Sequence, residues 1–200
     1  MDPRIQAAVI AAVSAFIGVF IGGIIQNHLK EKEIKREKKV AEGAVALYLC
    51  QLRFLFMAFA DEKKTYNALE LRITPNENNM SEIDKIVSLI EKHDPFLIVR
   101  LLNIKQVLHN IRAGINNYYK QKEENDNPKL YGYRVDCINI DGTTGLNEVD
   151  ISIKHAFNFA EQSTKIYLLE QDEFKTFLSE ILGNGLYQRL RMKFKLINKI

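Results

Sequence analysis

The feature that most constrains this chain is an apolar run from Ile5 to Ile25, in which Gln6 and Ser14 are the only polar side chains. As a helix, its roughly 21 residues would extend about 31 Å, which matches the hydrocarbon core of a bilayer. A cleavable signal peptide is the main alternative, but its apolar region is shorter, and no convincing small-residue cleavage site follows the run. The sequence therefore predicts a transmembrane anchor within residues 1–29, with the lipid bilayer as its partner.

The charges beside this run predict its orientation. Basic side chains next to a span favour the cytoplasmic side, and acidic side chains count for little. Arg4 stands alone before the run, and residues 30–39 form a basic segment after it, expected to continue the helix. We expect a single-pass protein in a bacterial inner membrane, with its N-terminus outside and its C-terminal domain cytoplasmic. The basic residues after the run are Lys30, Lys32, Lys35, Arg36, Lys38 and Lys39.

Small residues recur at helical spacing along the anchor, with Ser14, Gly18 and Gly22 in one register. The last two form a GxxxG motif, which allows two transmembrane backbones to approach closely. The stripe predicts a homo-oligomer that packs through these three residues. The alternative is ordinary transmembrane composition, because glycine and alanine are common in such helices.

Residues 40–200 have the composition of one soluble domain. The whole chain is 46% hydrophobic and 26% charged, which is typical of a globular protein with its own core. Its two cysteines, Cys50 and Cys137, lie in apolar stretches and are better explained as core residues than as a disulfide framework. We predict a mainly α fold, in which a cytoplasmic helical bundle follows the anchor.

Two segments carry clear helical periodicity. The first is residues 40–73, although its apolar part, 44–60, also raises the alternative of a second membrane span. Gln51 and Arg53 lie in the middle of that part and favour a core helix, because a central arginine costs about 2.5–3.5 kcal/mol on insertion. The second segment is 97–118, whose apolar residues alternate at spacings of four and three and predict a helix with packed partners.

A small two-stranded β-ribbon is the other predicted element. Residues 131–138 alternate in polarity before an Asp141-Gly142 turn signal, and basic and apolar residues alternate over 188–196. Pairing them would bury one apolar face and present a basic face outward. A helix remains the alternative for the C-terminal segment, because Leu186, Leu190 and Phe194 also fit a helical period.

The basic face of this ribbon supplies the candidate contacts for an anionic ligand or lipid head group. These are Arg189, Arg191, Lys193 and Lys195, and the alternative is a solvated edge that discourages sheet aggregation. No catalytic residue, cofactor or metal site is predicted, because phosphate-binding and nucleophile motifs are absent. The four histidines also lack the close spacing of sequence-local metal sites.

These observations lead to three hypotheses of different classes. The favoured one is a membrane-anchored protein whose cytoplasmic helical domain binds a ligand or a protein partner of unknown identity, and which self-associates through its anchor. The second is a membrane-disrupting, pore-forming effector of bacterial stress or phage defence, with the soluble domain as its sensor; this one rests on analogy of layout. An enzyme comes third, because convergent titratable groups are not evident in the sequence.

Overall fold

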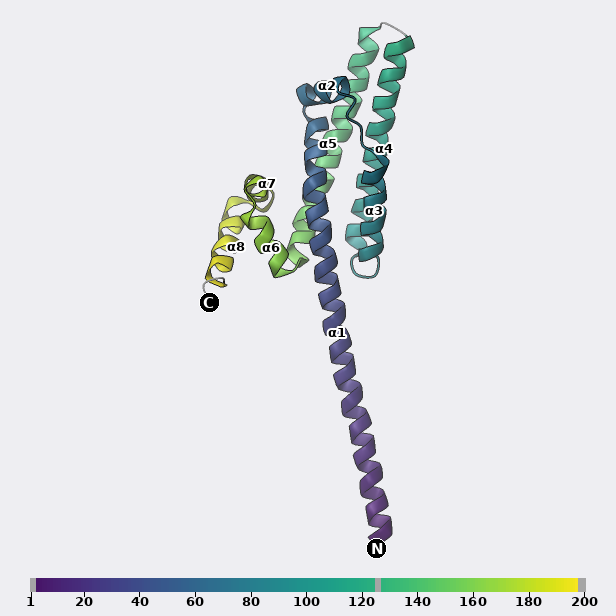
Figure 1. Ribbon diagram of the computed structural model, residues 1–200, viewed down its shortest axis with the longest axis vertical. Coiled ribbons are helices and arrows are strands. Elements are labelled where there is room, and N and C mark those ends of the chain that lie inside the picture. Colours follow the sequence, from purple (N-terminus) through teal and green to yellow (C-terminus); the bar gives the residue numbers. More distant parts are fainter. Residues whose placement is uncertain (1–2, 125–126, 198–200) are drawn as a thin grey trace. The chain divides into compact units, whose positions relative to one another are not determined.

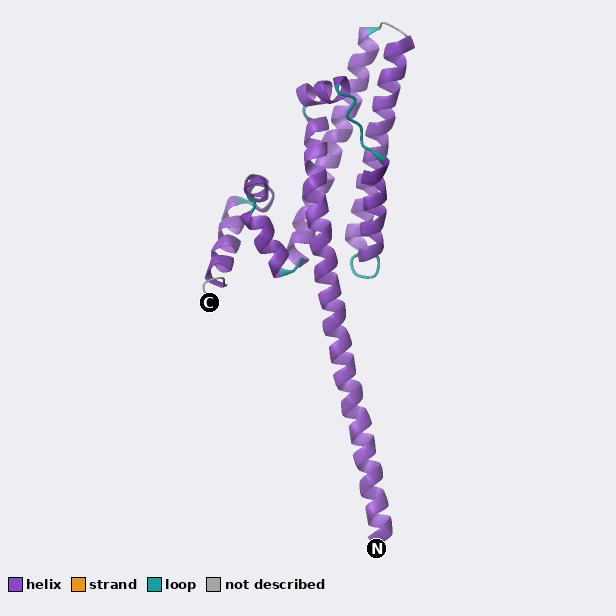
Figure 2. Ribbon diagram, viewed as in Figure 1, coloured by secondary structure: helices purple, strands orange, loops and turns teal. Residues whose placement is uncertain are grey.

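The structure is a computed structural model that describes residues 3–124 and 127–197. Within these residues the chain forms eight α-helices and no strand. Figure 2 shows the helices joined by loops and turns. The predicted mainly α fold is confirmed. The helices are labelled in Figure 1 and have the following bounds: α1 Pro3–Ala60, α2 Glu62–Glu70, α3 Glu77–Ile90, α4 Pro95–Glu124, α5 Pro128–Phe159, α6 Gln162–Glu170, α7 Asp172–Leu182 and α8 Asn184–Ile197.

The prediction of a two-stranded β-ribbon is wrong. Residues 131–138 lie in the first turns of α5, and residues 188–196 lie in α8. The start of α5 has a local cause, because the Asn127 side chain accepts a hydrogen bond from the Lys129 N–H and Pro128 occupies the first helical turn. The cap and the proline favour a helix at this point, although the alternation of polarity predicts a strand.

The helix expected over 40–73 is divided in two. The first part ends at Ala60, and the side chain of Asp61 then accepts a hydrogen bond from the Lys64 N–H and caps α2. The buried hydroxyl of Thr65 donates to the carbonyl oxygen of Phe59 at 2.8 Å, which satisfies a carbonyl at the end of α1. The chain therefore turns at Asp61 with its polar backbone groups paired.

The chain divides into two compact units, Met1–Glu37 and Lys38–Ile200, and α1 contains residues of both. Helix α1 is long and apolar enough to cross a membrane, by length and composition alone. Consecutive apolar side chains near its N-terminal end are exposed, among them Phe16 at 75%, Val19 at 77% and Phe20 at 63%. Its second half has the opposite character, because Val45 and Phe56 are fully buried.

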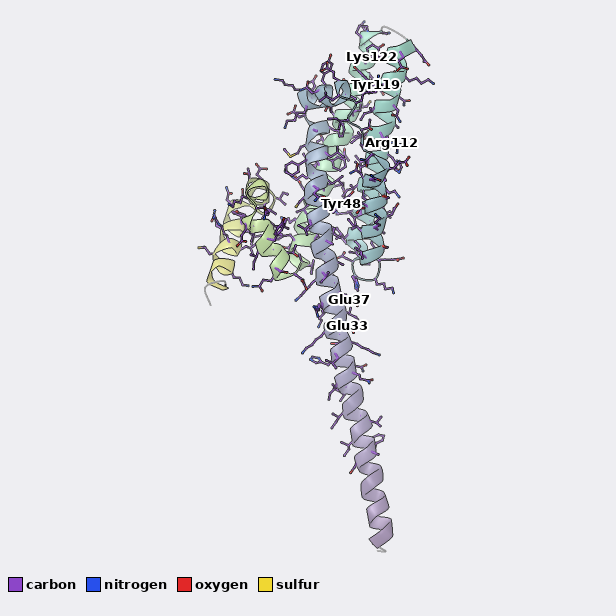
Figure 3. The ribbon with its side chains drawn as sticks, viewed as in Figure 1. Glu33, Glu37, Tyr48, Arg112, Tyr119 and Lys122 are labelled. Atoms are coloured by element: carbon purple, nitrogen blue, oxygen red, sulfur yellow. The ribbon has the colours of Figure 1, made fainter. Side chains whose placement is uncertain are left out.

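The core of the second unit is formed mainly by α1, α4 and α5, with α3 packed on α4 (Figure 1). The phenolic hydroxyl of Tyr48, labelled in Figure 3, donates to the Asn79 carbonyl at 2.7 Å and links α1 to α3. The heptad pattern predicted for 97–118 is buried along its whole length in α4. Its buried residues are Leu97, Leu101, Ile104, Leu108, Ile111, Ile115 and Tyr118.

Two glycines bring α5 into very close contact with α1. A Cβ at Gly142 would overlap the backbone of Phe59, and one at Gly145 would overlap the ring of Phe56. The Asp141-Gly142 pair predicts a turn, but Gly142 lies inside α5, where its missing side chain leaves space for the backbone of α1. Glycine in a helix interior costs about 1 kcal/mol relative to alanine, and here close packing of two helices offsets that cost.

An ion pair accompanies this contact. The Nε of Arg53 lies 2.7 Å from Oδ1 of Asp150, which joins α1 to α5 across their interface. The Arg53 side chain is 9% exposed, so removing Asp150 would leave a largely buried charge with weaker compensation. The arginine that argued against a second membrane span therefore has a partner in the helical core.

The close contact at Gly145 predicts a clear difference between two alanine substitutions in α5. Gly145→Ala should lower the free energy of unfolding by about 1–3 kcal/mol, because the added methyl group overlaps the Phe56 ring. Gly132→Ala is the matched control, since a Cβ there meets no atom within 4 Å. It should be neutral or stabilising by up to about 1 kcal/mol. Denaturant unfolding of the full chain in detergent, followed by circular dichroism, measures both; equal effects would contradict the packing.

Candidate functional site

The small residues predicted to pack in the membrane all lie in the first half of α1. Ser14 is exposed and Gly22 is half-buried. A Cβ added at Gly18 or Gly22 would meet no atom within 4 Å in the described part of the chain. A second helix has room to approach on this side, and self-association through the stripe stays a prediction.

The basic residues near the C-terminus do not form the expected single face, because they lie on a helix. Residues two apart on an α-helix point to different sides, while residues four apart share a side. Arg189 and Lys193 are both exposed on one side of α8, and Arg191 is half-buried on another. The side chain of Lys195 lies outside the described residues. Anion or lipid contact by this set stays a prediction without the flat basic surface that motivated it.

A cluster of polar side chains lies among apolar residues in the second unit. Glu42 comes from α1, Asp94 immediately precedes α4, and His155 comes from the last turns of α5. One ligand atom from each lies within 4.8 Å of those of the other two. Three elements far apart in sequence therefore place two carboxyl groups and an imidazole together.

Asp94 is the centre of this cluster. Its Oδ1 accepts a hydrogen bond from the Leu97 N–H at 3.0 Å, so the side chain caps the start of α4. Its Oδ2 lies 2.8 Å from Nε2 of His155. Burial raises the pKa of Asp94, but the hydrogen bonds from His155, the Leu97 N–H and Glu42 outweigh it and lower the pKa to about 2. Asp94 is therefore ionised at neutral pH.

The pKa of Glu42 is raised, whereas that of Asp94 is lowered. Glu42 is fully buried, and neither carboxyl oxygen has a hydrogen-bond donor among the described side chains. Burial and then the neighbouring Asp94 raise the pKa of Glu42 to about 8, against a smaller opposing effect of the Lys38 charge. Near neutral pH the Glu42 carboxyl is therefore largely protonated, and its O–H can donate to the Asp94 carboxylate.

A lysine and two aromatic rings complete the surroundings. The Nζ of Lys38 lies 3.5 Å from Oδ2 of Asp94 and 4.6 Å from the centre of the Phe159 ring. The imidazole of His155 packs beside Phe159 at 5.0 Å and beside Phe96 at 4.7 Å, between ring centroids. These rings restrict the orientation of the imidazole and leave the His155 side chain 25% exposed. The cluster thus combines buried acids with limited access to solvent.

Sequence reasoning missed this cluster for a simple reason. Metal-site motifs in a sequence have closely spaced ligands, whereas Asp94 and His155 are 61 residues apart and come into contact only in the folded chain. One local signal was present, because Glu42 is the only charged residue from Val40 to Cys50. A carboxyl group in such an apolar run must be neutral, paired or bound once the helix is buried.

A groove of about 790 Å³ lies between α2, α4 and α5, apart from this cluster. Tyr66, Tyr118 and Tyr131 contribute aromatic surface, and charged groups of both signs lie beside them. Lys122, near the end of α4 in Figure 3, is one of these groups. Such a mixture of aromatic and polar groups is typical of sites for small ligands or inserted side chains.

Comparisons with protein-family models, with curated proteins and with solved structures find no match to this chain.

The pKa of Glu42 predicts how stability depends on pH. Between pH 4.5 and about 8 the folded state holds a proton on Glu42 that the unfolded chain releases, so the free energy of unfolding should fall as pH rises. The loss should approach roughly 5 kcal/mol, since a pKa raised from 4.5 to about 8 is worth about 1.4 kcal/mol for each pH unit between the two values. Glu42→Gln should flatten this dependence and exceed the wild type in stability at pH 8, because the amide stays neutral and can donate to Asp94.

Denaturant unfolding of both proteins over this pH range, in a chelating buffer, provides the measurement. Asp94, His155 and Lys38 remain in both proteins, so the difference between the two curves isolates Glu42. Parallel curves would show that Glu42 is ionised in the folded protein and would contradict the assignment.

Proposed function

We propose that this chain is a single-pass membrane protein that uses the segment Ile5–Ile25 as its anchor and residues 38–200 as a cytoplasmic binding domain. The observation that carries the proposal is the run of exposed apolar side chains in the first half of α1, which nothing in the described chain covers. Exposing such a surface to water is unfavourable by about 25 cal/mol per Å², and a bilayer removes that cost.

The distribution of these side chains distinguishes a span from a helix that lies flat on a membrane. A surface-bound helix has one apolar and one charged face. In α1 the successive residues Phe16, Ile17, Val19, Phe20 and Ile21 are all at least half exposed, so the helix is apolar on every side. A helix of that kind belongs inside a bilayer or a large core.

The binding part of the proposal is supported by the groove between α2, α4 and α5. It offers aromatic surface from three tyrosines with charges of both signs at its margin, which suits a small aromatic ligand or an inserted aromatic side chain. The bundle around it is packed on a continuous core, so the groove walls are held by the fold. We place ligand or partner binding there.

The second hypothesis, a pore-forming effector, would need the anchors to line a water-filled path. The segment Ile5–Ile25 has only Gln6 and Ser14 as polar side chains, which disfavours a hydrated lining built from this helix. Membrane potential in cells that overproduce the protein separates the two hypotheses. An anchored binding protein should leave it unchanged, and a collapse would favour the effector.

Topology gives the first test of the anchor. A reporter active only in the cytoplasm should be active when fused after Ile200, and a reporter active only outside the cytoplasm should be silent there. The reason is the excess of basic residues after the span, from Lys30 to Lys39, over Arg4 before it. The reverse pattern would refute the proposed orientation or indicate a second span within residues 44–60.

Self-association gives the second test. Gly18→Ile combined with Gly22→Ile should weaken crosslinked oligomers in native membranes without reducing insertion, because large side chains hold two backbones apart while keeping the helix apolar. Val19→Ile is the matched control for added bulk at a site outside the stripe. Unchanged crosslinking in the double variant would assign any assembly to the helices of the domain instead.

A further inference from the structure

We propose that Glu42, Asp94 and His155 form a binding site for one divalent transition-metal ion, with Zn²⁺ as the representative. Their ligand atoms lie within 4.8 Å of one another and come from three separate elements of the fold. The inference is independent of the proposed anchor, because all three residues belong to the unit Lys38–Ile200.

The distances suit an ion after small side-chain movements. A tetrahedral ion with bonds of about 2.1 Å holds its ligand atoms about 3.4 Å apart. The pair His155 Nε2 and Asp94 Oδ2, now 2.8 Å apart across a shared proton, would open slightly when the ion replaces that proton. The wider separations, up to 4.8 Å, would close by about 1 Å through rotation of side-chain torsions.

The strongest support beyond proximity comes from Glu42. Its side chain is fully buried, and apart from the proton that its carboxyl group can share with Asp94, neither carboxyl oxygen has a hydrogen-bond partner among the described residues. Buried polar groups in native proteins are nearly always satisfied by protein, water or an ion. A cation bound between Glu42 and Asp94 would displace the Glu42 proton to solvent, satisfy these oxygens and balance the charges of the two carboxylates.

The other two ligands are already held in suitable orientations. Asp94 directs Oδ1 to the Leu97 N–H, which fixes the carboxylate so that Oδ2 points toward His155, where the ion would bind. The ring of His155 is held between Phe96 and Phe159. Such outer contacts are what orient metal ligands in proteins, and they limit the entropy lost on binding.

The ligand types identify the class of ion. One imidazole nitrogen with two carboxylate oxygens suits Zn²⁺, Mn²⁺ or Fe²⁺ better than Mg²⁺ or Ca²⁺, which take oxygen ligands alone. Three protein ligands leave at least one position of the ion for water. The partly exposed side of His155 provides a way in from solvent.

Lys38 is the cation that would compete with the ion. Its Nζ lies 3.5 Å from Oδ2 of Asp94, so metal binding requires this ammonium group to move away. The side chain is 31% exposed and has a flexible stem, so its ammonium group can turn out into solvent. Removing this positive charge should therefore strengthen metal binding, which makes it a specific test.

The experiment uses the full chain in detergent after treatment with a chelator and removal of any histidine tag. Titration calorimetry with Zn²⁺ and Mn²⁺, together with the visible d–d absorption of Co²⁺, reports stoichiometry and ligand environment. We expect one ion per chain. Glu42→Gln and His155→Gln should each weaken binding by at least about tenfold to 100-fold, the loss seen when even an outer partner is removed.

Matched controls come from exposed residues of the same types, Glu91→Gln and His109→Gln, which should bind as the wild type does. Lys38→Gln should raise the affinity. If Glu42→Gln does not fold, Glu42→Asp keeps a carboxylate on a shorter side chain and should weaken binding without abolishing it. The proposal is overturned if the wild type shows no saturable binding of any of the three ions. Binding that survives both ligand substitutions would overturn it equally.

Discussion

The close contact between α1 and α5 is the constraint on which the rest of the helical domain depends. Gly142 and Gly145 remove two side chains so that Phe59 and Phe56 can lie directly against α5. Helices normally pack with axes 8–10 Å apart, and small residues allow the closer values. The Arg53–Asp150 pair is formed across this same interface, and the Glu42–Asp94–His155 cluster joins α1 and α5 to the start of α4.

The sequence predicted the helices whose periodicity is carried by large apolar side chains. The segment 97–118 is the clearest case, and every residue of its pattern is buried in α4. Helix α5 has an equally regular pattern, but two glycines occupy buried positions of its first half, so hydrophobicity alone does not reveal that half. The buried positions that continue the spacing are Ile138, Gly142, Gly145, Val149, Ser152 and Ala156. The strand predicted over 131–138 came from the alternation of polarity there, which the helical positions further along α5 did not outweigh.

The polar cluster could not be predicted, because no single stretch of sequence contains two of its members in ligand spacing. Two of its three residues did have a local role that the sequence could suggest. Asp94 before Pro95 is a typical start of a helix, and Glu42 interrupts an apolar run. The sequence does not show which helices pack against one another. In the fold, this packing brings His155 to Asp94, the residue that precedes α4.

Arg53 also matters while the chain is still being synthesised. Helix α1 leaves the ribosome before the α5 residues that bury its second half have been synthesised. During that interval the apolar stretch 44–60 would follow the proposed anchor into the same insertion machinery. A central arginine opposes lateral release into lipid by about 2.5–3.5 kcal/mol. Once Asp150 has been synthesised, Arg53 forms an ion pair with it, so under the proposed anchoring one residue would first oppose membrane insertion and later be paired inside the helical domain.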